Sequence, residues 1–207
     1  MVITLVPGTR DWSPSNDIAN SRWWQSQSPF TQMWHHQGFT RHGFEWAGSE
    51  IPQWGTVLSG TFWSDRTHRT WWRGAFGQAS DLAQLPLQDR NLICHSHGGN
   101  LGVLVEHLLR TRGFGGLNSL TTICTPNRRD MASYYHGVAC PWLAVYNTNI
   151  VTNRMQWMGA RGNRWKMPEA TNVNLKCIGH SRLIREPYQF AEHHHDILMP
   201  FIKKAGQ

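Results

Sequence analysis

The chain has 207 residues, which is enough for one domain with a substantial core and too few for two. Hydrophobic residues make up 40% of it and charged residues 16%, a globular composition, and no apolar run is long enough to cross a bilayer. The net charge of +7 comes from scattered Lys and Arg, so we expect attraction to anionic surfaces but no dedicated nucleic-acid-binding function. We therefore expect a single soluble domain over residues 1–207, cytoplasmic by default because no secretory signal is evident.

The first part of the chain predicts one strand–helix–strand unit. Residues 2–6 are branched and apolar and predict a buried strand, which is followed by a Pro-Gly-Thr turn. Phe30, Met33 and Trp34 have the spacing of a helix face, and residues 39–46 alternate like a second strand. Residues 47–67 are rich in Gly, Ser and Trp without a clear period, and we expect them to form a surface excursion near the site.

The rest of the chain alternates between helix and strand patterns. The predicted helices are 70–85, 99–112 and a closing helix at 187–202, and the predicted strands are 91–95, 117–124, 142–146 and 173–178. This order is typical of an α/β fold with a mostly parallel sheet, helices on both faces and ligands at the carboxyl ends of the strands.

Residues 94–99, Cys-His-Ser-His-Gly-Gly, stand between a predicted strand and a predicted helix. This is the context of a nucleophile elbow, in which a sharp turn exposes a reactive serine above the sheet. Ser96 is the predicted nucleophile, with Cys94 in the place of the usual first glycine. A plain polar loop between strand and helix is the alternative, because short motifs also arise by chance.

A base and an oxyanion hole complete the predicted site. His180 follows the last predicted strand and is expected to accept the Ser96 proton as general base. The backbone N–H groups of His97 and Thr9 are the expected oxyanion donors, because they follow the nucleophile and the first strand respectively.

Four segments in this order carry a resemblance to a known family: Val-Pro-Gly-Thr at 6–9, His-Ser-His-Gly-Gly at 95–99, Thr-Pro at 125–126 and Gly-His-Ser at 179–181. Together they resemble a compact α/β-hydrolase of the serine esterase and lipase type over nearly the whole chain, and they are also similar to small hydrolase-like proteins of phages. The resemblance implies an eight-stranded or slightly reduced α/β-hydrolase sheet, a Ser-His-acid triad and no cofactor. The sequence itself shows no separate segment for a large lid domain, so none is expected.

The acid of the triad departs from the family pattern. The resemblance places it after the strand at 142–146, where Asn147, Asn149 and Asn153 stand and no carboxylate occurs. Asp130, after the preceding strand, is the best substitute, because some hydrolases of this fold hold their acid there. It could equally be a helix N-cap or a partner of Arg128.

These residues predict a serine hydrolase that cleaves a carboxylic ester through an acyl-enzyme on Ser96. The expected substrate is a small-molecule or envelope-derived ester. The alternative function is a hydrolase-like protein that has lost its acid and binds a ligand or partner in a Trp-rich pocket.

Other reactive side chains have simpler interpretations. We read the four cysteines as reduced and buried, with a reactive Cys94 as the alternative. His95 and His97 have the spacing of two metal ligands but lack further ligands nearby, so no metal is expected. The run at 193–196, His-His-His-Asp, is expected to lie on a solvated helix face.

Overall fold

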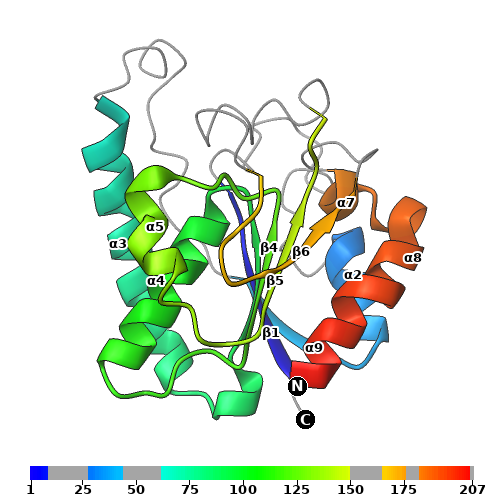
Figure 1. Ribbon diagram of the computed structural model, residues 1–207. Coiled ribbons are helices and arrows are strands. Elements are labelled where there is room, and N and C mark those ends of the chain that lie inside the picture. The colour runs from blue at the N-terminus through cyan, green and yellow to red at the C-terminus, as the bar shows by residue number, and fades with distance from the viewer. Residues whose placement is uncertain (9–27, 44–61, 150–164, 176–181, 206–207) are drawn as a thin grey trace.

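The computed structural model describes residues 1–8, 28–43, 62–149, 165–175 and 182–205. They contain a six-stranded sheet in the order β2-β1-β3-β4-β5-β6, and each neighbouring pair is parallel (Figure 1). The strands are β1 Val2–Val6, β2 Thr40–Gly43, β3 Asn91–His95, β4 Ser119–Ile123, β5 Trp142–Tyr146 and β6 Thr171–Asn174. Because the pairing is parallel, the carboxyl ends of all six strands meet at one edge, where open α/β sheets bind their ligands.

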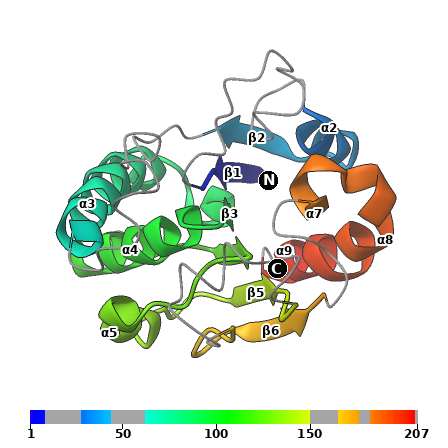
Figure 2. The same ribbon diagram turned by 90° about the horizontal axis from the view of Figure 1, so that it is seen from above.

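Helices cover both faces of this sheet, as Figure 2 shows from above. One face carries α3 Phe62–Ala83, α4 Gly98–Thr111 and α5 Ala132–Tyr135, and the other carries α2 Pro29–His36, α7 Arg182–Arg185, α8 Ala191–His193 and α9 Met199–Ala205. Within the described residues, none of these helices combines the length and the apolar character that a membrane span requires.

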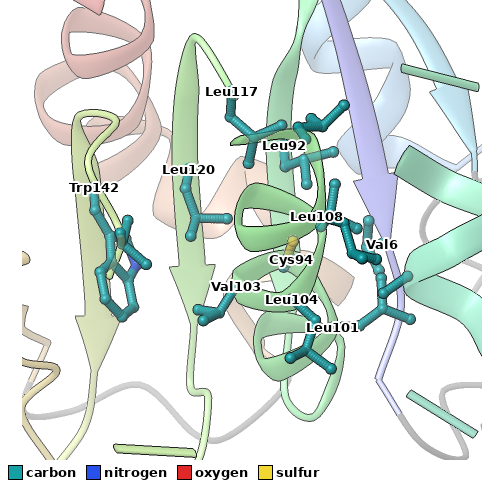
Figure 3. Packing of buried hydrophobic residues seen from close by; sticks show 14 of the residues in the cluster. Val6, Leu92, Cys94, Leu101, Val103, Leu104, Leu108, Leu117, Leu120 and Trp142 are labelled. Carbon is teal, nitrogen blue, oxygen red and sulfur yellow. The ribbon is translucent and has the colours of Figure 1, made fainter. Parts of the chain in front are cut away.

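The strands supply a separate hydrophobic core to each face. Side chains alternate along a strand, so Leu92 and Cys94 of β3 pack into the core beneath α3 and α4, whereas Ile93 between them packs into the opposite core. Figure 3 shows the first core, which contains Leu104 of α4 and Leu120 of β4, and a Cβ atom on Gly102 of α4 would lie 3.0 Å from the Leu120 Cδ1 atom. Since both faces are covered, β3, β4 and β5 are buried along their whole length, and β5 accordingly reads Trp-Leu-Ala-Val-Tyr without a charged residue.

Several sequence predictions need correction at the ends of elements. The expected surface excursion at 47–67 is wrong from residue 62 onward, because α3 begins at Phe62, while residues 47–61 lie outside the described part. The first turns of α3 carry mostly polar residues without a regular apolar repeat, so periodicity located only its later part. Strand β6 begins at Thr171 rather than at residue 173 and is recorded as a strand only to Asn174.

The predicted closing helix is interrupted. Residues 187–205 form a 3₁₀ turn at Pro187–Phe190, then α8, a π-helical turn at His194–Leu198 and finally α9. The expectation of a fully solvated His run is wrong at its centre, because His194 is buried, packs against the Phe30 ring and places Nε2 3.0 Å from the Leu183 carbonyl oxygen. His195 and Asp196 are exposed as expected.

The described cysteines are free thiols. Cys94 and Cys124 are buried and Cys140 is half-buried, and Cys177 lies outside the described residues. Burial raises the pKa of the Cys94 and Cys140 thiols, so both favour the protonated, unreactive form at neutral pH. This environment supports the interpretation of Cys94 as a packing residue.

Candidate active site

Ser96 lies at the tight turn that joins β3 to α4. Its φ angle is +53°, a left-handed conformation that a serine rarely adopts. The turn is held at both ends, because the Ser96 N–H donates to the Ile123 carbonyl at 2.9 Å and the Ser96 carbonyl accepts from the Gly99 N–H at 3.0 Å. Ser96 is only 7% exposed. A strained serine after a central strand is the geometry of a nucleophile elbow.

The glycines after Ser96 are required by close contacts. A Cβ atom on Gly98 would lie 2.4 Å from the carbonyl oxygen of Pro7 and 2.7 Å from that of Val6. A Cβ atom on Gly99 would lie 2.0 Å from the Thr125 Oγ1 atom. The start of α4 can therefore approach the segments that follow β1 and β4 only because residues 98 and 99 have no side chains.

Cys94 occupies the place of the usual first glycine of the elbow motif, and Gly102 explains why it fits. Cys94 points from β3 toward α4, and a Cβ atom on Gly102 would lie 2.7 Å from the Cys94 Sγ atom (Figure 3). In the usual motif, a glycine on the strand lets the helix pack closely. Here the strand carries Cys94, and the missing side chain is that of Gly102 on the helix.

The two expected oxyanion donors belong to adjacent segments. His97 directly follows Ser96 at the start of α4. Strand β1 is paired with β3 so that Val6 lies beside Cys94, and residues 7 and 8 continue from there toward Thr9. Thr9 itself lies outside the described residues, so its role stays a prediction.

The imidazole of His97 is held as a neutral, buried group. Burial, together with the positive charge of Arg128, lowers the pKa of His97 from 6.5 to about 3, while Asp130 acts in the opposite direction. The His97 Nδ1 atom lies 3.4 Å from the Asn100 side-chain nitrogen, which can donate to it when Nδ1 is unprotonated. The side chain therefore stays fixed and uncharged beside the elbow at neutral pH.

Asp130 lies in the segment after β4 and forms an ion pair with Arg128. The Arg128 Nε and Nη2 atoms lie 2.9 Å from Oδ1 and 2.5 Å from Oδ2 of Asp130, in a bidentate arrangement. Arg128 is buried, whereas the Asp130 side chain is 31% exposed. The expected alternative as a partner of Arg128 is thus confirmed, and the alternative as an N-cap is wrong because Asp130 lies inside the 3₁₀ turn Arg129–Met131.

The segment after β5 holds an amide at the position where the resemblance places the acid of the triad. Asn147 is buried directly after β5, and its Oδ1 atom accepts the Asn149 backbone N–H at 2.8 Å. Asn153 and the expected base His180 lie outside the described residues. The role of His180 as general base therefore stays a prediction.

The described residues give no support to a metal centre. Among them, no group of three or more His, Cys, Asp or Glu side chains is arranged to hold a metal ion.

Sequence reasoning missed two polar side chains next to the elbow, Asn100 and Tyr135. Both are fully buried, and the Tyr135 hydroxyl donates to the Asn100 Oδ1 atom at 2.5 Å. The sequence did carry a signal for Asn100, because it is the only polar residue among the glycines and apolar residues that begin α4, and this part of the helix is buried on every side. Its partner is 35 residues away and carries no such signal.

The chain matches no protein-family model and no curated protein. Its fold is similar to solved structures of α/β hydrolases. An α/β-hydrolase enzyme from the sediment metagenome of the Mar Chica lagoon in Morocco aligns with a TM-score of 0.58 and 11% identity over 95% of this chain and 89% of that one. A probable hydrolytic enzyme from Pseudomonas aeruginosa aligns with a TM-score of 0.56 and 13% identity over 94% and 84%.

A thermophilic carboxylesterase from a metagenomic library aligns with a TM-score of 0.55 and 13% identity over 100% of this chain and 81% of that one. Similarity at this level of identity establishes the fold. The chain therefore has the α/β-hydrolase fold, which confirms the fold class predicted from the sequence.

Proposed function

We propose that the protein is a serine hydrolase that cleaves carboxylic esters through an acyl-enzyme on Ser96. The observation that carries the proposal is the φ angle of +53° at Ser96, in the turn between a central parallel strand and its helix. Strain at a non-glycine residue costs about 1–3 kcal/mol and is concentrated at functional sites. In the α/β-hydrolase fold, this is the position from which a serine reaches the substrate.

In the proposed reaction, the Ser96 oxygen attacks the carbonyl carbon of the ester while His180 accepts the hydroxyl proton. The carbonyl electron pair moves to its oxygen, and the resulting oxyanion accepts hydrogen bonds from the backbone N–H groups of His97 and Thr9. Collapse of this intermediate breaks the bond to the alkoxide, which takes the proton from His180. Water then attacks the acyl-enzyme in the same manner, releasing the carboxylic acid and restoring Ser96.

We assign the acid of the triad to Asp130. It follows β4 at the same edge of the sheet as Ser96, and Arg128 fixes the direction of its carboxylate by two hydrogen bonds. In this role Asp130 orients the His180 ring and stabilises the positive charge that the ring acquires. Asp130→Asn is expected to lower ester turnover by about 10²- to 10⁴-fold, because the amide keeps the shape but loses the charge.

The test is covalent labelling of the purified protein with a fluorescent fluorophosphonate, followed by mass spectrometry to locate the modified residue. We expect labelling at Ser96 alone, and Ser96→Ala should abolish labelling and lower ester turnover by about 10³-fold or more. Ser133→Ala removes an exposed serine on α5 and is the matched control, which should label like the wild type. Ester turnover retained in a clean Ser96→Ala preparation would refute the proposal.

A second candidate function is a binding protein that keeps the hydrolase fold without its chemistry. Two observations favour it. Asn147 places an amide after β5, and the only carboxylate assigned to the triad, Asp130, is already paired with Arg128. The same experiment decides between the two functions. Absence of labelling in the folded wild type supports the binding protein, whereas labelling at Ser96 excludes an inert serine.

A further inference from the structure

A buried hydrogen-bond network connects the elbow to the segment that carries Asp130. Its members are His97, Asn100, Tyr135, Arg128 and Asp130, which come from α4, from α5 and from the segment between β4 and α5. The network thus joins three parts of the chain on one side of Ser96. Asn100 and Tyr135 take no part in the reaction proposed for Ser96 and Asp130, so their function in the network needs a separate explanation.

Asn100 forms the end of the network nearest to Ser96. It lies in the first turn of α4, and its own N–H donates to the His97 carbonyl at 3.1 Å. Its side-chain nitrogen lies 3.4 Å from both the His97 Nδ1 atom and the Pro126 carbonyl oxygen. The amide therefore contacts the elbow on one side and the segment after β4 on the other.

Tyr135 forms the centre of the network. Its hydroxyl donates to the Asn100 Oδ1 atom at 2.5 Å and accepts the Arg128 backbone N–H at 3.1 Å. The Arg128 side chain in turn holds Asp130 through both carboxylate oxygens. One hydroxyl group therefore connects α4, which begins at Gly98 directly after the Ser96–His97 turn, to the residue that orients Asp130.

Burial makes each of these hydrogen bonds costly to lose. Asn100 and Tyr135 are both fully buried, so water does not replace a partner that is lost there. A buried polar network keeps its members in one arrangement when each hydrogen bond is made. The network can therefore hold the relative position of the two segments more tightly than apolar packing alone.

We propose that Tyr135 and Asn100 are positioning residues that fix the Ser96–His97 turn relative to the Asp130 segment. The inference rests on the proposed hydrolase function, and it adds two residues that touch neither substrate nor the reacting atoms. Removing the Tyr135 hydroxyl leaves the buried Asn100 oxygen and Arg128 N–H without this partner. The two segments then lose their shared connection while the ring of residue 135 still fills the core.

The test compares Tyr135→Phe with Tyr134→Phe in the full chain. Tyr134 is the matched control, because it undergoes the same chemical change on the same helix, but its ring packs between Trp72 and His107 instead of joining the network. The readouts are the maximal rate of fluorophosphonate labelling at Ser96, the probe concentration that gives half of that rate, and the fraction of folded protein at the assay temperature. A small misplacement of reacting groups costs up to about 10²-fold in rate.

We expect Tyr135→Phe to lower the maximal labelling rate by about ten- to a hundredfold at an unchanged half-saturating concentration, while Tyr134→Phe labels like the wild type. An unchanged rate in Tyr135→Phe, or a decrease that merely follows the loss of folded protein, would overturn the inference and leave the proposed function intact. If Tyr135→Phe does not fold, Asn100→Ser is measured in its place with the same expectation. A folded wild type that is not labelled at Ser96 overturns the proposed function, and this inference with it.

Discussion

Gly98 faces backbone atoms in the turn that holds Ser96, so this position has no room for a side chain. A Cβ atom there would lie 2.4 Å from the Pro7 carbonyl oxygen, and backbone cannot rotate away as a flexible side chain can. We expect Gly98→Ala to lower the free energy of unfolding by about 1–3 kcal/mol, the usual cost of overpacking, and to slow labelling of Ser96 by displacing α4. Urea denaturation together with the labelling rate measures both effects.

Gly137→Ala is the control for Gly98→Ala. Gly137 is exposed, and the nearest atom to an added Cβ is the Tyr134 carbonyl oxygen at 3.4 Å, which is ordinary contact. This variant should keep both the stability and the labelling rate of the wild type. Equal behaviour of the two variants would show that the start of α4 can move away from β1 without cost.

The residues around Ser96 show what a motif reveals and what it leaves out. The pattern at 94–99 located the strained serine, because the order of strand, turn and helix is contained in consecutive residues. It did not reveal that Gly102 makes room for Cys94, or that Tyr135 bonds to Asn100. Those contacts depend on how α4 packs on the sheet and against α5, which no local pattern encodes.

At the scale of elements, the sequence predicts the positions of the buried strands more closely than that of the edge strand β6. The bounds predicted for β3 and β5 are confirmed at both ends, whereas the prediction of 117–124 for β4 is too long at both ends. The apolar residues at 92–94 of β3 and throughout β5 have the pattern of strands that are buried on both faces. Strand β6 lies at the edge of the sheet and reads Thr-Asn-Val-Asn, so only its third residue matches that pattern. The start of α3 was missed because its first residues have no regular apolar repeat.

Glu106 of α4 joins the helix to the segments that precede β4 and β5. Its carboxylate accepts the Leu117 N–H at 2.6 Å and the Ala139 N–H at 3.4 Å, and burial raises its pKa. In Glu106→Gln, one oxygen is replaced by an NH₂ group that cannot accept from a backbone N–H. We therefore expect the variant to lose about 1–3 kcal/mol of unfolding free energy in urea at neutral pH.

The control for Glu106→Gln is Glu192→Gln, the same replacement at an exposed position of α8. It should change the unfolding free energy by less than about 0.5 kcal/mol, as is usual for surface substitutions. A stability of Glu106→Gln equal to that of the control would show that the carboxylate does not stabilise the two segments.

At the scale of the whole molecule, each face of the sheet contains a buried histidine. His97 lies at the start of α4 on one face, and His194 lies in the core of the other face against Phe30. Burial is the main cause that lowers the pKa of each, to about 3 for His97 and about 4 for His194, from an ordinary 6.5. Each layer therefore contains a buried imidazole that is neutral at neutral pH.

These two groups make the stability of the fold sensitive to acid. Between pH 6.5 and about 4 the unfolded chain protonates both imidazoles while the folded chain keeps them neutral, so the unfolding free energy decreases as the pH falls. Glu106 acts in the opposite direction, because its raised pKa lets the folded chain bind a proton before the unfolded chain does. The slope of the unfolding free energy against pH is the sum of these opposing contributions. Substituting one residue at a time separates them.

His194→Gln isolates one of the contributions. It should reduce the slope of unfolding free energy against pH by about one proton, or about 1.4 kcal/mol per pH unit, between roughly pH 4.5 and 6. Urea denaturation at a series of pH values measures the slope independently of any change in absolute stability. Met199→Leu alters a buried residue of the same core without a titratable group and should keep the wild-type slope. If His194→Gln also keeps it, His194 is protonated in the folded chain as readily as in the unfolded one, and the burial of its ring does not hold it neutral.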